Sequence, residues 1–261
     1  MASILDRYGI KEVADVTFYK LDTNGNKTFP VLYLDTLKVS TIEQTAENTS
    51  ARGGKGNPEL IVWDYGKEIT VTLEDALFSM KSMAIMYGAV DNSKNPQVVT
   101  DTTKLETIYK TLPKSVIVGK GSEADTQFTV DIGGKNLTVA ASSISWYAED
   151  GIANSTVDIG SAAYGTFVVP VKDAQQIEIS AATFPGNYYV TGDTYARNEK
   201  NGEDEFFQFI IPKAKVMSEV TLTMEAEGDP STFSMNLRVL RPEDGKMMKL
   251  VKYDINTGSN G

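Results

Sequence analysis

The sequence predicts a mainly-β fold, a β-sandwich or β-barrel with one packed α-helix and one long loop between strands. Short runs rich in Val, Ile, Thr and aromatic residues alternate with turn segments rich in Gly, Asn and Asp along most of the chain. One segment shows a helical pattern with start and stop signals, and one polar stretch shows no apolar pattern. These three observations define the expected fold class.

The earliest strands are expected around an Asn-Gly turn. Val13–Leu21 has the composition of a strand, and the following Asn24-Gly25 pair suits a type I′ turn, in which both central residues need positive φ. Further strands are expected over Val31–Leu34 and Leu37–Ile42. The position of Gly25 does not match an EF-hand, so no calcium site is expected in this turn.

The polar stretch covers residues 43–58, with the sequence EQTAENTSARGGKGNP. Its glycines and Lys55 do not have the spacing of a P-loop or of a dinucleotide-binding loop. We therefore expect a long, mobile, polar loop. Loops of this length often bind a partner.

The predicted helix covers residues 73–87 and follows strands at Leu60–Trp63 and Ile69–Leu73. Thr72 is the expected N-cap, and Gly88 is the expected C-terminal stop. Apolar residues spread over more than one face of this helix. It is therefore expected either to lie in the core of a large domain or to be partly covered by a neighbouring subunit, with Met side chains adapting to the contact.

A second hairpin is expected from Phe128–Ile132 and Leu137–Ala141, which flank Gly133-Gly134. Glu205–Ile211 (EFFQFII) is a later strand with apolar residues on both sides. One side suits the core, and the other would be exposed unless a subunit interface covers it. The tail at residues 256–261 is expected to be frayed.

The composition excludes many kinds of chemistry. The 261 residues contain no Cys and no His, so a disulfide, a thiolate nucleophile and a Ser-His-Asp triad are all excluded. Enzyme activity is therefore not favoured, and no sequence motif indicates catalytic residues, a cofactor or a metal site. The net charge of −10 disfavours tight binding of nucleic acid. The apolar runs are too short to cross a membrane, and the N-terminus lacks a secretory pattern, so a cytosolic or particle-bound protein is expected.

Acidic residues form several clusters, including one at Asp64, Glu68, Glu74 and Asp75. A glycosidase needs two carboxylates facing each other across a cleft, one of them in an apolar setting. The linear sequence does not show such geometry. Turns and solvated faces are the favoured explanation of these clusters.

Two stretches have a distinctive order of elements. The first is Pro58–Gly88, in which strand, turn and strand lead into an apolar helix, and the second is Phe184–Phe233, which ends in IPKAKV, an alternating strand and Glu-Gly-Asp-Pro. Both stretches resemble the major tail (tube) proteins of long-tailed bacteriophages. The resemblance divides the chain into a first part of the tube domain at 1–90, an uncertain segment at 91–180 and closing strands at 181–255. The middle segment is expected to be an insertion or a decorating subdomain.

The resemblance implies a subunit that forms rings, usually hexameric, which stack into a tube through which the phage genome passes. It implies a protein of the virion tail, assembled in the host cytoplasm, that contacts itself and other tail proteins, and no membrane. DNA would pass without adhering, because an acidic lumen repels phosphates. A long loop between early strands reaches the adjacent ring in such proteins, and residues 43–58 fit that role. The candidate subunit-interface residues are Glu43, Glu47, Arg52, Lys55, Trp63, Phe78, Met80, Met83, Met86 and Phe207.

Two alternatives remain open from the sequence. One is a carbohydrate-binding or carboxylate-dependent carbohydrate-active β-sandwich module, which would use exposed Trp and Tyr side chains to stack on sugars. The other is a different tail component of related fold, such as a completion protein or a baseplate hub. Polymerisation into long tubes, as opposed to a single ring, would separate the tube protein from these tail components.

Overall fold

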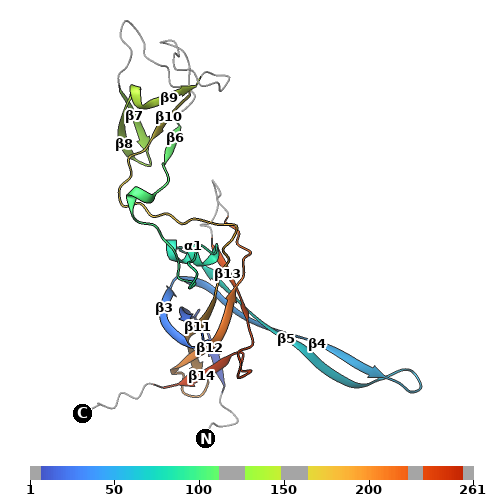
Figure 1. The fold of residues 1–261 in the computed structure, drawn as a ribbon. Coiled ribbons are helices and arrows are strands. Elements are labelled where there is room, and N and C mark those ends of the chain that lie inside the picture. The colour runs from blue at the N-terminus through green and yellow to red at the C-terminus, as the bar shows by residue number, and fades with distance from the viewer. Residues whose placement is uncertain (1–6, 112–126, 148–163, 223–231, 255–261) are drawn as a thin grey trace. The chain divides into compact units, whose positions relative to one another are not determined.

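The computed structural model describes residues 7–111, 127–147, 164–222 and 232–254. The chain divides into two compact units (Figure 1). Unit 1 is formed by Met1–Val98 and Ile177–Gly261, and unit 2 by Val99–Gln176. The described residues are mostly β-strand with one α-helix, which confirms the predicted mainly-β class. The tail at 256–261, predicted to be frayed, lies outside the described residues.

The strands of unit 1 belong to one antiparallel sheet. Its order is β3-β2-β11-β12-β13-β5-β4, with β1 beside β11 and β14 beside β12. The strands are β1 (Tyr8–Ile10), β2 (Asp15–Leu21), β3 (Lys27–Leu34), β4 (Leu37–Arg52), β5 (Glu59–Asp75), β11 (Asn187–Asn198), β12 (Asp204–Val216), β13 (Phe233–Val239) and β14 (Lys249–Tyr253).

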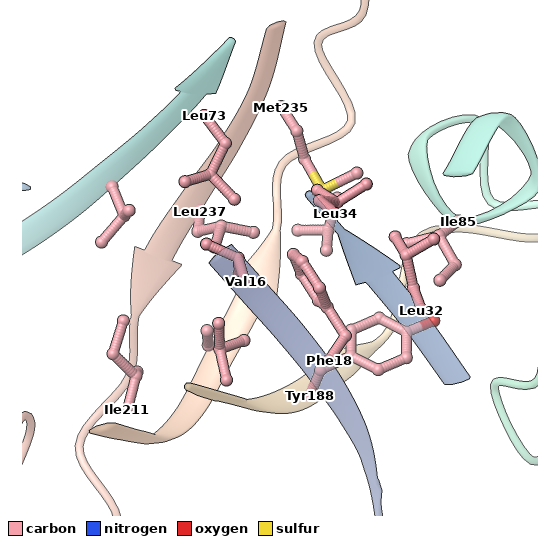
Figure 2. Close-up of a cluster of buried hydrophobic side chains, with 14 of the residues drawn as sticks. Val16, Phe18, Leu32, Leu34, Leu73, Ile85, Tyr188, Ile211, Met235 and Leu237 are labelled. Atoms are coloured by element: carbon pink, nitrogen blue, oxygen red, sulfur yellow. The ribbon is translucent and has the colours of Figure 1, made fainter. Parts of the chain in front are cut away.

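The sheet curls around a single core. Side chains from β2 and β3 meet side chains from β5 and β13, although four strands separate β3 from β5 in the sheet order (Figure 2). Val16, Leu73 and Tyr188 are among the residues with no exposed surface. We call the side of the sheet that faces this core the inner face, and the opposite side the outer face.

The predicted helix over residues 73–87 is wrong in extent. The structure has α1 only at Met80–Met86, and residues 69–75 form the end of β5, paired with both β13 and β4. The β-branched run Ile69–Thr72 favours a strand, and two neighbouring strands outweigh the local helical spacing. The N-cap is Ser79, whose side chain accepts a hydrogen bond from the backbone N–H of Ser82. Gly88 ends the helix at φ +72°, as predicted.

The first hairpin is confirmed, but its turn type is wrong. Among the central residues only Gly25 has positive φ, at 80°, so the turn is not of type I′. The Asp22 carboxylate accepts hydrogen bonds from the backbone N–H groups of Asn26 and Asn24, at 2.7 and 2.9 Å. These bonds, led by that from Asn26, hold the pKa of Asp22 below its usual value.

The predicted polar loop at residues 43–58 is also wrong. Strand β4 continues to Arg52, and only residues 53–58 form the turn into β5. The stretch lacks apolar periodicity because its strand faces solvent on both sides: residues 43–49 of β4 are all exposed. Its Thr, Ser and Glu side chains are compatible with an edge strand.

Unit 2 is a smaller all-β unit. The predicted second hairpin is confirmed as β7 (Gln127–Ile132) and β8 (Lys135–Ala140), joined at Gly133 and Gly134. Strands β6 (Tyr109–Thr111), β10 (Tyr164–Val168) and β9 (Ile144–Tyr147) form a second sheet in that order. Short 3-10 turns lie at Thr102–Lys104 and Ala141–Ser143. Val139, Ile144 and Phe167 make up its buried core.

The described part of the chain contains no helix that is both long enough and apolar enough to span a membrane.

Candidate assembly surfaces

An exposed feature of unit 1 is a two-stranded ribbon formed by β4 and β5. Strand β13 pairs with β5 only from Thr70 to Asp75, so the ribbon between Glu43 and Glu68 has no third strand among the described residues (Figure 1). We call residues 43–68 the arm. An isolated two-stranded hairpin is only marginally stable in water, because neither of its faces is buried. The arm is therefore a surface that needs a partner.

A bulge marks the start of the arm. Thr45 pairs with Glu68, but Glu47 pairs with Tyr65, so β5 carries one extra residue here. Gly66 has φ +62°, the left-handed conformation that glycine adopts without strain in such bulges. Because of the extra residue, odd-numbered side chains of β5 beyond the bulge continue the outer face of the sheet.

The outer side of the arm is apolar along β5 and polar along β4. Ile61, Trp63 and Tyr65 alternate along β5 and are about half exposed, Trp63 at 51%. Their cross-strand neighbours are Ala51, Thr49 and Glu47. Leu60 and Val62 are exposed on the other side. This much apolar surface is typical of an interaction site.

The tip of the arm is a glycine-rich turn. Gly54, Gly56 and Asn57 all have positive φ, which explains why two glycines are needed here. An ion pair between Arg52 and Glu59, with 3.2 Å between Nη2 and Oε2, joins the two strands at the base of the turn. Lys55 lies exposed in the turn itself.

Six of the ten predicted interface residues lie away from the helix. Five of them lie on the arm, and one lies on β12. Glu43, Glu47, Arg52 and Trp63 lie on the arm's strands, and Lys55 lies at its tip. Phe207 lies half-buried on the inner side of β12, where Lys252 of β14 is its cross-strand neighbour.

The helix residues among the candidates are mostly turned inward. Met83 and Met86 are 8% and 3% exposed and are buried in the chain itself, so little of either side chain is left for a partner. Met80 is partly exposed. Phe78 precedes the helix, is exposed, and packs on Phe233 with 4.7 Å between ring centroids. Of these four residues, Phe78 offers the most surface for an interface.

Near the opposite edge, the first and last strands of unit 1 lie on the same part of the sheet. β1 pairs with β11, and β14 pairs with β12. Lys252 on β14 contacts the Glu205 carboxylate and donates a hydrogen bond of 3.1 Å to the Tyr8 hydroxyl. The Glu205 side chain, followed by the Tyr8 hydroxyl, raises the pKa of Lys252, which stays protonated. This contact joins the two end strands of unit 1.

The outer face of the central strands carries two neighbouring carboxylates. Asp15 on β2 and Asp193 on β11 are directly opposite each other. Neither forms an ion pair with any described residue. Tyr33 donates a hydrogen bond of 3.2 Å to Asp15. Partial desolvation, with the charges of Asp15, Asp35 and Asp193, raises the pKa of Tyr33. Like charges across a strand pair reduce stability, and a hydrogen bond of 2.7 Å from Gln208 to Asp193, together with that from Tyr33 to Asp15, offsets part of this cost.

No catalytic arrangement emerges among the described residues. Within them, no group of three or more Asp or Glu side chains has the geometry to hold a metal ion. The acidic cluster noted in the sequence is dispersed: Asp64 lies on the arm, Glu68 pairs with Arg238 at 2.6 Å, and Asp75 accepts a hydrogen bond from Thr36.

Comparison with known proteins identifies the class of protein to which this mainly-β chain belongs. The tail tube protein of Bacillus phage SPR is 23% identical over 235 residues, which cover 83% of this chain and 78% of that protein. The family described as YomU/Tube protein matches residues 8–252. The resemblance to phage tail tube proteins, structural components of the virion tail, is thus confirmed. The chain belongs to the YomU/Tube protein family.

Proposed function

We propose that this protein assembles with copies of itself into rings, and that the rings stack into the phage tail tube. The family supports a structural role in the tail. The observation that carries the proposal is the arm, a ribbon with apolar side chains on both sides and no third strand in the described part of unit 1. A surface of this kind is stabilised when a second copy covers it.

The outer face of the sheet is the candidate lining of the tube. The inner face encloses the core, so only the outer face is left to line a channel if the sheets of neighbouring subunits join. Asp15 and Asp193 place negative charge on that face, in keeping with the net charge of −10 for the chain. Such a lining repels DNA phosphates, so that DNA passes through without adhering.

The arm is the candidate contact to the adjacent ring or subunit, and other tail proteins would meet the same surfaces at the ends of the tube. The proposed contact residues are Glu43, Glu47, Arg52, Lys55 and Trp63 on the arm, with Phe78, Met80 and Phe207 elsewhere on unit 1. Met83 and Met86 are left out because their own chain buries them.

Negative-stain microscopy of the purified protein tests the proposal directly. We expect rings at low concentration and tubes at high concentration, with sedimentation velocity reporting the same species. Single rings that never stack would favour a completion protein or a hub. A strictly monomeric protein at high concentration would contradict the proposal.

Unit 2 is proposed to be a decorating module that the tube domain carries as an insertion. Its two ends are held together by a reciprocal pair of hydrogen bonds: the Val99 N–H donates to the Gln176 carbonyl at 2.8 Å, and the Gln176 N–H donates to the Val99 carbonyl at 2.9 Å. An insertion whose ends meet can be removed without stretching the chain on either side.

Excision of Val99–Gln176, with a short Gly-Ser linker between Val98 and Ile177, is expected to leave unit 1 folded and able to assemble. The core of unit 1 contains no residue of unit 2, so the free energy of unfolding of unit 1 should change by less than about 1 kcal/mol. Chemical denaturation followed by far-UV circular dichroism measures the first effect, and microscopy the second. Loss of cooperative unfolding would show that unit 2 is a structural part of the tube domain.

A further inference from the structure

The edges of the sheet differ in their ability to accept another strand. The edge strand β3 carries Pro30, which has no N–H to donate. In the described residues, β1 pairs only with β11 and β4 only with β5, so each has one side with unpaired backbone groups. Neither strand contains a proline. β1 and β4 are therefore open edges on opposite sides of the sheet. β14 pairs only with β12 in the described residues and is a third open edge, on the same side of β12 as β4, but its Lys249 and Lys252 have the same sign of charge as the β1 edge.

The strand directions allow these two edges to pair in a ring. From β1 the sheet runs through β11, β12, β13 and β5 to β4, and every neighbouring pair is antiparallel. After five such steps β4 runs opposite to β1. In a ring whose copies all have the same orientation, β4 of one copy would meet β1 of the next as an antiparallel pair, the geometry in which hydrogen bonds lie perpendicular to the strands.

The charges on the two edges are complementary. Glu43 and Glu47 are four residues apart on the outer side of β4, and Arg7 and Lys11 are four residues apart at the ends of β1. Gly9 pairs with Arg197 and lies between them, so Arg7 and Lys11 fall on the same outer side. One antiparallel register brings Glu43 to Lys11 and Glu47 to Arg7 together, with Thr45 opposite Gly9.

The four side chains of this register are free to form ion pairs with a second copy, because nearby charged groups do not hold them tightly. Arg7 has only a long contact of 3.7 Å to Glu199, with both side chains more than half exposed. Asp204 is engaged by Arg197 at 2.6 Å, and Lys11 has no ion pair with a described residue. Glu43 and Glu47 likewise have no ion-pair partner in the described part of the chain. A cross-strand pair of opposite charges contributes roughly 0.2–1 kcal/mol, so the two pairs mainly fix the register.

The surface at β1 is hollowed. A hollow of about 490 Å³ is lined by residues 7–11 and by Arg197 and Glu199 at the end of β11. On the inner side the same register places Ala46 opposite Tyr8 and Gln44 opposite Ile10. A small side chain opposite a tyrosine lets the two strands approach without a clash.

We infer that β4 of one copy adds to the β1 edge of the next copy, antiparallel, with Glu43 opposite Lys11 and Glu47 opposite Arg7. The inference rests on the proposed ring and names the two edges that close it. Strand addition of this kind gains main-chain hydrogen bonds for affinity and side-chain contacts for specificity. The sheet then continues from chain to chain, and β4 is no longer an open edge.

Charge reversal tests the pairing. The double variants R7E/K11E and E43K/E47K should each raise the protein concentration needed for half-maximal assembly by at least about tenfold, measured by sedimentation. The variant with all four changes should assemble near the wild-type concentration, because the opposite charges meet again. The control variant K81E/K249E changes two exposed lysines elsewhere and should assemble normally. Normal assembly of either double variant, or no recovery in the combined variant, overturns the pairing.

Cysteine crosslinking tests the register, because the natural chain has no cysteine. A Cβ at Gly9 would meet nothing within 4 Å, so the variant G9C/T45C should fold. Mild oxidation of assembled G9C/T45C should give a ladder of covalent oligomers, whereas G9C/A46C, displaced by one residue to the other side of the strand, should not. Rings without a ladder overturn the pairing and leave the ring proposal standing. A wild-type protein that forms no rings overturns both.

Discussion

A variant in which Asn-Gly replaces residues 46–67 should remain folded but lose the ability to assemble. Thr45 and Glu68 are cross-strand partners, so a two-residue turn can join them directly. No removed residue belongs to the core of unit 1. The change deletes the exposed stripe of Ile61, Trp63 and Tyr65, and with it the apolar area available to a neighbouring copy. Complete loss of rings and tubes is expected.

Microscopy and sedimentation measure this loss, and the cooperativity of chemical unfolding checks that the sheet is intact. A milder variant, I61S/W63S, keeps the length of the arm and should weaken assembly without changing the core. The matched control L77S removes an exposed apolar side chain outside the arm and should assemble more readily than I61S/W63S. If the shortened variant forms tubes at the wild-type concentration, the arm is not the assembly surface.

Gly192→Ala should give the largest loss of stability from a single methyl group. Gly192 on β11 pairs with Phe209 on β12, and the Phe209 ring lies across the glycine. A Cβ at this position would stand 2.1 Å from two ring atoms of Phe209. Phe209 is only 3% exposed, so the ring has little room to move. We expect the free energy of unfolding to fall by about 2–3 kcal/mol.

A double variant identifies the cause of that loss. Phe209→Leu alone leaves space over Gly192 and should be destabilising, but Gly192→Ala/Phe209→Leu should cost less than the sum of the two single changes. Gly9→Ala is the control, because its Cβ would meet open space. The measurement is urea unfolding followed by fluorescence. Additive losses would contradict a clash between the methyl group and the ring.

Local patterns predicted the elements whose partners are close in sequence. The hairpins at β2–β3 and β7–β8 follow from their turn residues and their β-branched strands. The predicted extent of the helix, residues 73–87, was wrong because β13, which is far along the chain, pairs with residues 70–75 and holds them in a strand. The prediction of a loop over residues 43–58 was wrong because an edge strand that is exposed on both sides shows no alternation of apolar and polar residues.

The candidate site was predictable in part, and for the same reason. The absence of an apolar pattern indicated a polar surface segment that contains Glu43, Glu47 and Arg52, although this segment was predicted to be a loop and is a strand. The sequence could not pair Asp15 with Asp193, because their opposition depends on the register of β2 against β11. Likewise the stripe of Ile61, Trp63 and Tyr65 depends on a one-residue bulge in β5. Beyond the bulge, odd-numbered side chains point to the face that even-numbered side chains occupy before it. Gly66 next to a β-rich run is the one local signal for that bulge.

If unit 2 is a decorating module, as proposed, stacking of the rings would multiply it along the tube. A single module would contact an external surface with only its own affinity. If every subunit of a tube carried one, the modules would form a regular array along its length. Effective concentration would then turn a weak single contact into avid attachment, by a factor on the order of 10² to 10⁴ where the spacing of the sites on that surface matches. Because the ends of unit 2 meet at the hydrogen bonds between Val99 and Gln176, and the core of unit 1 contains no residue of unit 2, a change within unit 2 should leave the sheet of unit 1 intact.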